Sequence, residues 1–393
     1  MNLKLKNSAR HLIQQLFTPR RILLALLLTA FGLLAPAPAR AVGTWTPLTH
    51  GAPTIIGTTF LLTDGTVMAQ GYNTPNWYRL TPDTNGSYVN GTWTTLASMQ
   101  ATHAYYSSQV LRDGRVYVGG DEYGNGSQQA EFYQPTNNTW TRNDPGSAFP
   151  GSPDVNNYGA SGLLPNGNVI VATFTAPKTP GPGENTTVIY DVTSNTWSVG
   201  PKMIEFTDEG TFVKLPDDSL LTLDINGVTA ERYIPALNKW IVDAPRPVVL
   251  YNDYGEMGGG YMLPNGKLIF LGGTSHTAIY TPSGTTNAGT WTAGADFPYE
   301  RGMSDAPSAM MVNGKILCAA SPNNLVGGDT QYFEYDYVAN AFTQLNSPFG
   351  GTNYGAATFI QTMMPLPDGT VLYCSFYGGT SRLYARWFAS GGW

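Results

Sequence analysis

A short turn of Asp or Asn, followed by Gly in all but one copy, recurs at nearly constant intervals along the chain. Successive copies are separated by 49, 53, 51, 48, 48 and 55 residues. Each copy lies between an apolar stretch and a β-branched stretch, which is the strongest short-range signal for a β-hairpin. The seven turns are Asp64-Gly65, Asp113-Gly114, Asn166-Gly167, Asp217-Asp218, Asn265-Gly266, Asn313-Gly314 and Asp368-Gly369. A repeat of this length indicates one supersecondary unit used many times.

Aromatic residues keep the same period. Each turn is followed, 22 to 30 residues later, by an aromatic residue that opens another short strand: Trp93, Trp140, Trp197, Trp240, Trp291, Phe342 and Trp393. In four units a Tyr lies seven residues before that aromatic: Tyr133, Tyr190, Tyr233 and Tyr335. We therefore expect four strands a, b, c and d in each unit, with a type I′ turn between a and b and a tight turn between c and d. No segment shows helical periodicity.

Repeated four-stranded units predict an all-β fold, a seven-bladed β-propeller of four-stranded antiparallel blades. The ring must close on itself. Residues 44–48 have the pattern of a strand d but precede the first hairpin, whereas the chain ends at Trp393, where the last strand d should begin. We expect residues 44–48 to complete the last blade, so that residues 42–393 form one propeller.

The first 41 residues read as a secretory signal peptide. Five basic residues precede the apolar run Ile22 to Leu34, which ends in Ala39-Arg40-Ala41. The run is shorter than the roughly 20 residues of a spanning helix, so we expect cleavage after Ala41 rather than an uncleaved anchor. The prediction is bacterial-type export to the periplasm or the cell exterior, with no stable membrane span after cleavage. Arg20-Arg21 is a weak sign of twin-arginine export.

Charge excludes one class of partner. Without the leader the chain keeps 15 Lys and Arg against 27 Asp and Glu, a net charge of −12. No run of three basic residues remains, so nucleic acid is not an expected partner. Cations, neutral sugars and basic proteins stay open, and a monomer is expected. The two cysteines, Cys318 and Cys374, are expected to be buried free thiols.

The repeat resembles the Kelch-type propellers, and among them the exported group around the central domain of galactose oxidase. The likeness rests on a Leu-Pro-Asx-Gly turn at residues 164–167, 263–266 and 366–369, on double glycines at 119–120, 272–273 and 378–379, and on the Tyr and Trp markers. The resemblance implies a copper-radical oxidase or a sialate mutarotase-like enzyme as an alternative activity. The oxidases' Tyr-His pair is missing after the leader, and only His50, His103 and His276 remain. No cofactor is therefore predicted; neither copper nor calcium has support in the motifs.

A candidate site lies where each strand a begins, at the mouth of the central channel on the face of the longer connections. Function concentrates on loops held by a rigid scaffold. Polar and aromatic residues stand nine to thirteen residues before the turn Gly: His103, Tyr105, Asn157, Tyr158, Asp208, Glu209, Asp253, Glu256 and Asp305. They could bind a metal ion, a sugar or a basic side chain. The alternative is that they cap strand ends, and for His103 that it packs.

The sequence therefore favours a carbohydrate- or protein-binding module that acts through this long-loop face. A carbohydrate-active enzyme and a structural envelope component are the alternatives. An enzyme requires carboxylates or a metal converging at the mouth, with perturbed pKa values. A structural component would have no concave pocket there.

Overall fold

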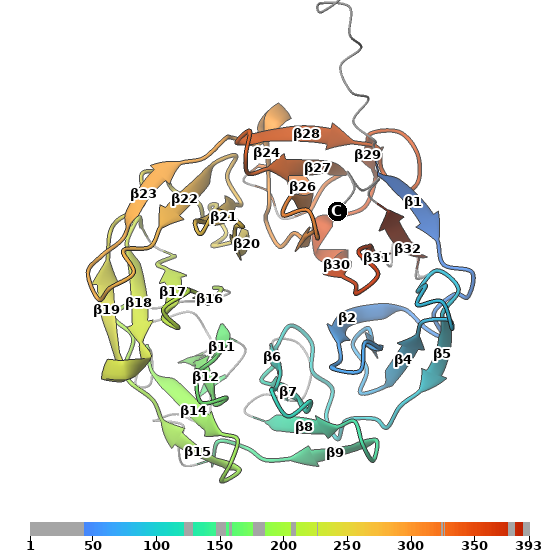
Figure 1. Cartoon of the computed structure of the whole chain (residues 1–393), viewed down its shortest axis with the longest axis horizontal. Coiled ribbons are helices and arrows are strands. Elements are labelled where there is room, and N and C mark those ends of the chain that lie inside the picture. The colour runs from blue at the N-terminus through green and yellow to red at the C-terminus, as the bar shows by residue number, and fades with distance from the viewer. Residues whose placement is uncertain are drawn as a thin grey trace, which may run out of the picture. The chain divides into compact units, whose positions relative to one another are not determined.

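The computed structural model describes residues 43–121, 129–146, 155–156, 159–175, 185–205, 210–225, 227–323, 325, 327–375 and 382–387. This part of the chain is built from short antiparallel strands arranged in a ring (Figure 1). Within the described residues, three 3₁₀ turns interrupt the connections: η2 (Pro235–Leu237), η3 (Pro298–Glu300) and η4 (Thr358–Ile360). Among the described residues, no helix is long and apolar enough to span a membrane.

Six of the sheets are four-stranded antiparallel blades. Blade 1 comprises β2 (Ile56–Leu61), β3 (Val67–Gly71), β4 (Trp77–Thr81) and β5 (Thr92–Thr95). Blade 2 comprises β6 (Ser107–Val110), β7 (Val116–Gly119), β8 (Ala130–Gln134) and β9 (Thr139–Arg142). Blade 3 comprises β11 (Ser161–Leu163), β12 (Val169–Ala172), β14 (Thr187–Asp191) and β15 (Thr196–Val199). Blade 4 comprises β16 (Val213–Lys214), β17 (Leu220–Leu223), β18 (Ala230–Ile234) and β19 (Lys239–Asp243). Blade 5 comprises β20 (Met257–Met262), β21 (Leu268–Gly272), β22 (Thr277–Thr281) and β23 (Thr290–Ala293). The closing blade comprises β30 (Gln361–Pro365), β31 (Val371–Ser375), β32 (Arg382–Trp387) and β1 (Thr44–Pro47). The fold is thus an all-β propeller, as expected.

The expectation of uniform four-stranded blades fails at one sheet, which has six strands. It contains β24 (Arg301–Gly302), β25 (Ser308–Met310), β26 (Ile316–Pro322), β27 (Thr330–Asp336), β28 (Ala341–Leu345) and β29 (Asn353–Tyr354). Its central strands β26 and β27 are seven residues each, longer than the four or five of β7 and β8. The extra length leaves backbone groups to pair, and β24 and β29 take them. Blade 3 has a smaller version, in which β10 (Val155–Asn156) pairs with β13 (Phe174–Thr175).

Ring closure follows the sequence prediction. β1 pairs antiparallel with β32, with Thr44 opposite Trp387 and Pro47 opposite Tyr384. The fourth strand of the closing blade therefore comes from the start of the propeller, while its other three strands come from the end of the chain. Figure 1 shows the first strand of each blade nearest the axis and the fourth at the rim.

The a–b turns lie where predicted, but their type is not I′. Only the second residue of each Asx pair has a positive φ, for example 82° at Gly65 and 66° at Asp218. The Gly65 N–H donates to Leu62 O at 3.0 Å and the Leu62 N–H donates to Thr66 O at 2.9 Å. This is the three-residue loop in which a type I turn precedes a left-handed residue. The Asp64 carboxylate accepts the Thr66 N–H, which explains why Asx holds the first position.

The Tyr and Trp markers fix the outer hairpin. Tyr133 packs on Trp140 with ring centroids 5.3 Å apart, and its hydroxyl donates to Asn138 Oδ1 at 3.0 Å. Asn138 has φ 55° and occupies the left-handed position of the c–d turn. The same Tyr–Asn contact joins Tyr190 to Asn195, Tyr233 to Asn238 and Tyr335 to Asn340.

The hydrophobic core lies between neighbouring sheets. Met68 and Trp77 of blade 1 pack with Val118 and Tyr133 of blade 2, and each of the other clusters likewise combines two adjacent sheets. Trp140 Nε1 donates to Ala97 O at 3.0 Å, which ties the rim of blade 2 to the end of blade 1. Cys318 and Cys374 are buried free thiols in separate clusters, as predicted.

Candidate functional site

The predicted site residues fall into two groups. Asn157, Tyr158, Asp208 and Glu209 lie outside the described residues, so their place in a site stays a prediction. His103, Tyr105, Asp253, Glu256 and Asp305 are described, and the structure separates them.

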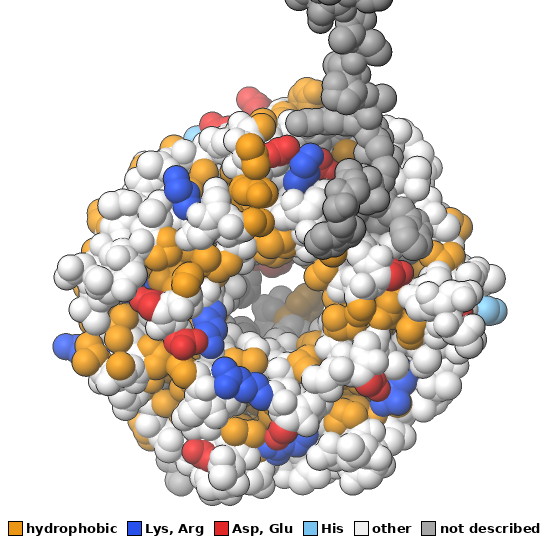
Figure 2. All heavy atoms as spheres, in the orientation of Figure 1, with side chains coloured by type: hydrophobic (Ala, Val, Ile, Leu, Met, Phe, Trp, Pro, Cys, Tyr) orange, Lys and Arg blue, Asp and Glu red, His pale blue; other side chains and the backbone are white. Residues whose placement is uncertain are grey.

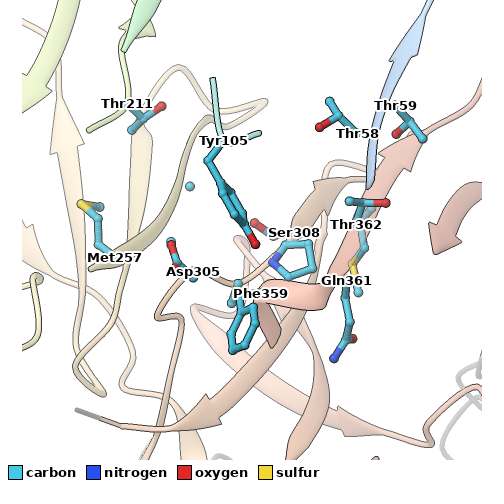
Figure 3. Close-up of a pocket in the computed structure, with 15 residues that line it drawn as sticks. Thr58, Thr59, Tyr105, Thr211, Met257, Asp305, Ser308, Phe359, Gln361 and Thr362 are labelled. Atoms are coloured by element: carbon cyan, nitrogen blue, oxygen red, sulfur yellow. The ribbon is translucent and has the colours of Figure 1, made fainter. Parts of the chain in front are cut away.

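Tyr105 and Asp305 line a cavity at the channel mouth, which we call the channel pocket. It has a volume of about 460 Å³. Its walls come from β2, β20, β25 and β30, the innermost strands of four sheets, and from the segments that precede the first strands. Figure 3 shows the Tyr105 ring hanging into this space, with Asp305, Ser308 and Phe359 around its hydroxyl end. The space-filling view shows an opening at the ring axis (Figure 2).

Both residues occupy a strained backbone conformation. Tyr105 has φ 54° and Asp305 has φ 45°, and each stands nine residues before the turn Gly of its repeat, Gly114 or Gly314. The left-handed region costs an L residue roughly 1–2 kcal/mol, more readily tolerated by Asp than by Tyr. The Tyr105 side chain is 41% exposed despite its size. Strain of this kind collects at ligand-binding sites, and here it aims an aromatic ring into a pocket.

Small residues also line the channel pocket. They are Gly258 and Gly259 on β20 and the Ala306-Pro307-Ser308 segment at β25. Their small side chains let the strands converge and at the same time leave the space that the cavity occupies.

Gln361 forms a rigid polar wall of the pocket. Its side-chain NH₂ donates to Thr330 Oγ1 at 2.7 Å and to Ala357 O at 2.8 Å. Its Oε1 accepts the hydroxyls of Tyr332 at 2.8 Å and Tyr373 at 3.0 Å. Burial raises the pKa of both tyrosines, so both remain neutral donors. This network fixes the amide and the adjoining residues.

His103 is a packing residue. It is fully buried, its Nδ1 lies 2.6 Å from Gly120 O, and its Nε2 lies 3.4 Å from Glu131 Oε1. The Glu131 carboxylate accepts the Gln100 N–H at 2.8 Å and the Ala101 N–H at 2.9 Å. The pair therefore anchors the connection from blade 1 to blade 2 and does not line the channel pocket.

Asp253 and Glu256 belong to a tight turn. Asn252 Oδ1 accepts the N–H groups of Tyr254 and Glu256, each at 2.9 Å. Asp253 is exposed and Glu256 is buried. Neither lines the channel pocket, although the next residue, Met257, does.

Exposed aromatic side chains gather on the long-loop face. In the described part of the chain the exposed Tyr and Phe side chains all lie on b–c or d–a connections: Tyr72, Tyr105, Tyr254, Tyr299 and Phe359. Phe359 also lines the channel pocket. It stands ten residues before Gly369, inside the window that supplied the candidate residues, but it has no polar group, which all of those candidates have.

The described residues do not form a copper site. His50 Nδ1 lies 2.9 Å from Gly91 O, and His276 Nδ1 lies 2.9 Å from Asp296 Oδ1. With His103 they belong to three separate parts of the ring. No group of three or more His, Cys, Asp or Glu side chains within the described ranges could hold a metal ion. The donor set that the resemblance implies is thus not assembled by these residues.

Comparison with known proteins supports the fold. No family model matches the chain, and no curated protein matches it in sequence. A fungal alcohol oxidase of the AA5 family, solved with copper, aligns over 88% of this chain and 76% of its own with 15% identity and a TM-score of 0.66. The virginiamycin B lyase of Staphylococcus aureus covers 88% of this chain and 98% of its own, with 11% identity and a TM-score of 0.56.

An extracellular domain of the two-component system BT4673 from B. thetaiotaomicron aligns over 87% of this chain but 39% of its own, with 12% identity and a TM-score of 0.55. At such low identity these likenesses concern the fold alone. The chain is similar in fold to an oxidase, a lyase and an extracellular domain, and its own activity must be argued from its site.

Proposed function

We propose that the protein is a carbohydrate-binding module whose ligand occupies the channel pocket. The observation that carries the proposal is the exposed ring of Tyr105, held in a strained backbone inside a cavity of about 460 Å³. That volume is within the range of small-ligand sites, about 300–1,000 Å³.

The chemistry of the walls matches a sugar. A pyranose has apolar C–H faces that pack on aromatic rings, and Tyr105 and Phe359 offer such rings. Its hydroxyl groups need donors and acceptors at the edges, where Asp305, Ser308 and Thr362 stand. A neutral polyol uses all of these groups without leaving a buried charge unpaired.

The wider assignment is part of the same proposal. We propose an exported, monomeric, seven-bladed Kelch-type propeller, in which the six-stranded sheet serves as the sixth blade. The signal peptide of residues 1–41 and the site roles of Asn157, Tyr158, Asp208 and Glu209 belong to this proposal too. On the face in view in Figure 2, Lys and Arg are scattered rather than gathered in one patch, which supports a partner other than nucleic acid.

A glycan-array screen followed by calorimetry tests the proposal. Tyr105→Asn keeps a residue that tolerates the left-handed backbone but removes the ring, and we expect binding of the selected glycan to weaken at least tenfold. Asp305→Asn should weaken it by a similar factor.

Tyr299→Asn is the matched control. Tyr299 is 67% exposed on the same face with φ 59°, but it does not line the channel pocket, so this variant should bind normally. Loss of binding in Tyr299→Asn with retention in Tyr105→Asn would overturn the assignment and favour a ligand spread over the outer loops.

A further inference from the structure

A second cavity lies on the opposite side of the fold, between the a–b turn of blade 3 and the c–d turn of blade 4. Its volume is about 490 Å³. Asn168 and Ile189 of blade 3 line one side, and Tyr233, Pro235 and Asn238 of blade 4 line the other. We call it the interblade pocket. It shares no residue with the channel pocket.

At the matching place between blades 2 and 3, an arginine fills the cleft. Arg115 of blade 2 lies 5.8 Å from the ring centroid of Tyr190 and donates to the Tyr190 hydroxyl at 2.9 Å. Its guanidinium also donates to Val192 O at 3.3 Å and to Asp113 Oδ2 at 2.8 Å. The arginine therefore joins one blade to the tyrosine and c–d turn of the next.

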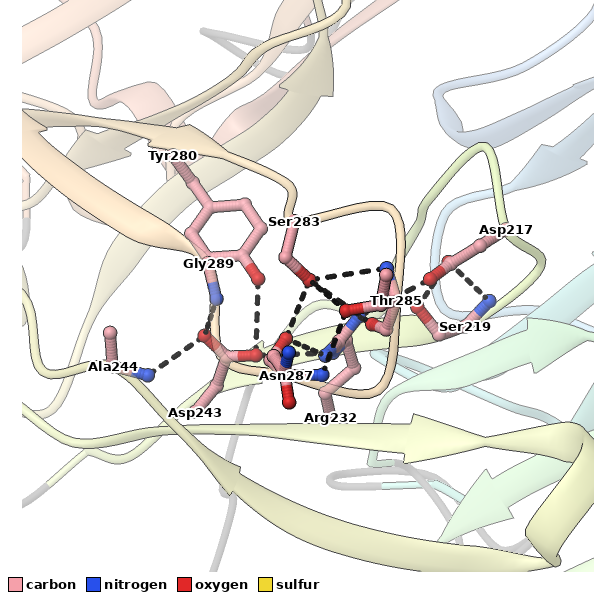
Figure 4. A network of polar contacts seen from close by, with 10 residues as sticks. All are labelled: Asp217, Ser219, Arg232, Asp243, Ala244, Tyr280, Ser283, Thr285, Asn287 and Gly289. Atoms are coloured by element: carbon pink, nitrogen blue, oxygen red, sulfur yellow. Dashed lines mark hydrogen bonds and ion pairs between the residues drawn. The ribbon is translucent and has the colours of Figure 1, made fainter.

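Two other clefts also receive an arginine. Arg79 of blade 1 donates to the Tyr133 hydroxyl of blade 2 at 3.4 Å. Arg232 of blade 4 is fully buried and donates to Thr285 O at 3.0 Å and Asn287 O at 2.7 Å in the c–d turn of blade 5 (Figure 4). Asp243 and Asp217 complete its partners at 3.1 and 3.2 Å.

Blade 3 lacks the arginine at both positions from which these side chains come. Tyr190 faces Trp197 in blade 3 as Leu80 faces Trp93 in blade 1, so Tyr190 and Leu80 hold equivalent positions. Ile189, one residue before Tyr190, is therefore equivalent to Arg79, one residue before Leu80. Asn168 follows the turn Gly167 as Arg115 follows Gly114. The acceptors remain. Tyr233 is buried, and its hydroxyl donates to Asn238 Oδ1 at 3.0 Å. The carbonyl of Pro235 follows Tyr233 by two residues, as the carbonyl of Val192 follows Tyr190.

The environment of Tyr233 differs from that of its counterparts accordingly. Burial raises the pKa of all three tyrosines, and a neighbouring arginine opposes the rise at Tyr133 and Tyr190. At Tyr233 burial is the cause and no cation opposes it. Nearby, Asn168 Nδ2 donates to Asp191 Oδ2 at 3.1 Å, and hydrogen bonds, first from the Ser194 N–H, lower the pKa of Asp191 and keep it anionic.

We propose that the interblade pocket binds a guanidinium group presented by an arginine of a partner protein. The incoming group donates to the Tyr233 hydroxyl oxygen and to Pro235 O, as Arg115 does at Tyr190 and Val192. The Asp191 carboxylate behind Asn168 supplies the counter-charge. A lysine, with a compact ammonium and no planar fork, fits this cleft less well.

Ligand-observed NMR on the mature protein tests the inference, with Nα-acetyl-arginine amide as the probe. We expect saturable binding of the arginine probe, and binding at least tenfold weaker for the isosteric citrulline derivative, which lacks the charge. Tyr233→Phe removes the hydroxyl acceptor but keeps the ring, and should weaken binding roughly tenfold.

Ile189→Arg places an arginine at the position of Arg79 and should abolish probe binding by filling the pocket. No saturable binding to the unmodified protein would overturn the inference. Equal binding of citrulline, or unchanged binding in Tyr233→Phe, would also overturn it, and neither outcome depends on whether Ile189→Arg folds. The glycan measurements on Tyr105 are independent of all of these results.

Discussion

At the scale of single residues, a few asparagines in left-handed conformation hold the outer hairpins together. Asn138 Oδ1 accepts both the Tyr133 hydroxyl and the Ala97 N–H, at 3.0 and 2.9 Å, and its φ is 55°. Asn138→Gly should lose the two hydrogen bonds but keep the backbone, at a cost of about 1–2 kcal/mol. Asn138→Ala should cost about 1 kcal/mol more because of the backbone strain. Urea unfolding measures both; equal stability of the two variants would contradict this account.

Glu231 makes stability depend on pH near neutrality. Burial raises the pKa of its carboxyl to about 7, and the charges of Glu205 and Asp224 act in the same direction. Hydrogen bonds from the backbone N–H groups of Ile204 and Glu205 lower the pKa and oppose part of this rise. In the unfolded chain the value is 4.5. The native state therefore holds a proton that the unfolded state has released, and the free energy of unfolding falls as pH rises from about 4.5 to about 7.

For Glu231 we predict that the free energy of unfolding depends on pH differently in the unmodified protein and in Glu231→Gln. The total decline due to Glu231 is at most about 3.5 kcal/mol, since one pKa unit corresponds to about 1.4 kcal/mol. Glu231→Gln should remove this part of the pH dependence while still accepting a hydrogen bond from Ile204. Urea unfolding of both proteins at about pH 5, 6, 7 and 8 measures it. Parallel profiles for the two proteins would show that Glu231 does not titrate in this range.

At the scale of strands and sheets, β1 closes the ring. Trp45 on this strand packs against Tyr332 and Tyr373, with ring centroids 5.8 and 5.2 Å away, and its Nε1 donates to Asn346 O at 2.9 Å. Removal of residues 43–48 should lower the melting temperature by at least 10 °C and favour aggregation, because β32 becomes an open edge. A protein beginning at residue 43 is the control. Equal melting temperatures and a monomeric elution profile for both would contradict the closing role.

The repeat markers predicted most strands because each marker has a local cause. The Asx side chain bonds the backbone within its own turn, and Tyr and Trp pack within one hairpin, so both leave a signal in nearby sequence. The strands β24 and β29 could not be predicted in this way. They pair with the ends of β26 and β27, and that pairing depends on the length of strands brought together only by the ring.

The site was predicted less well for the same reason. Counting back from the turn Gly selected Tyr105 and Asp305, which line the channel pocket, because the count follows strand a. The same count also selected His103, whose contacts with Gly120 and Glu131 join residues that are far apart in the sequence. The interblade pocket was not predicted from the sequence. It forms where blade 3 has no arginine at the positions of Arg79 and Arg115, and only the strand register shows that these positions are equivalent.

At the scale of the whole molecule, the ring separates two surfaces. The long-loop face carries the exposed aromatic residues and the channel pocket, and the face of tight turns carries the interblade pocket. A purely structural component would have no pocket at the channel mouth, so the cavity favours a binding role. Metal analysis of the purified protein checks the enzyme alternative, and we expect no stoichiometric copper or calcium. Stoichiometric copper would turn attention to Asp208, Glu209 and the other candidate residues outside the described ranges.

The most direct test of the central claim is a crystal structure of residues 42–393 with the glycan selected on the array. The account predicts a sugar ring in the channel pocket, packed on Tyr105 and hydrogen-bonded to Asp305. A glycan bound elsewhere, with the channel pocket filled only by water, would contradict it.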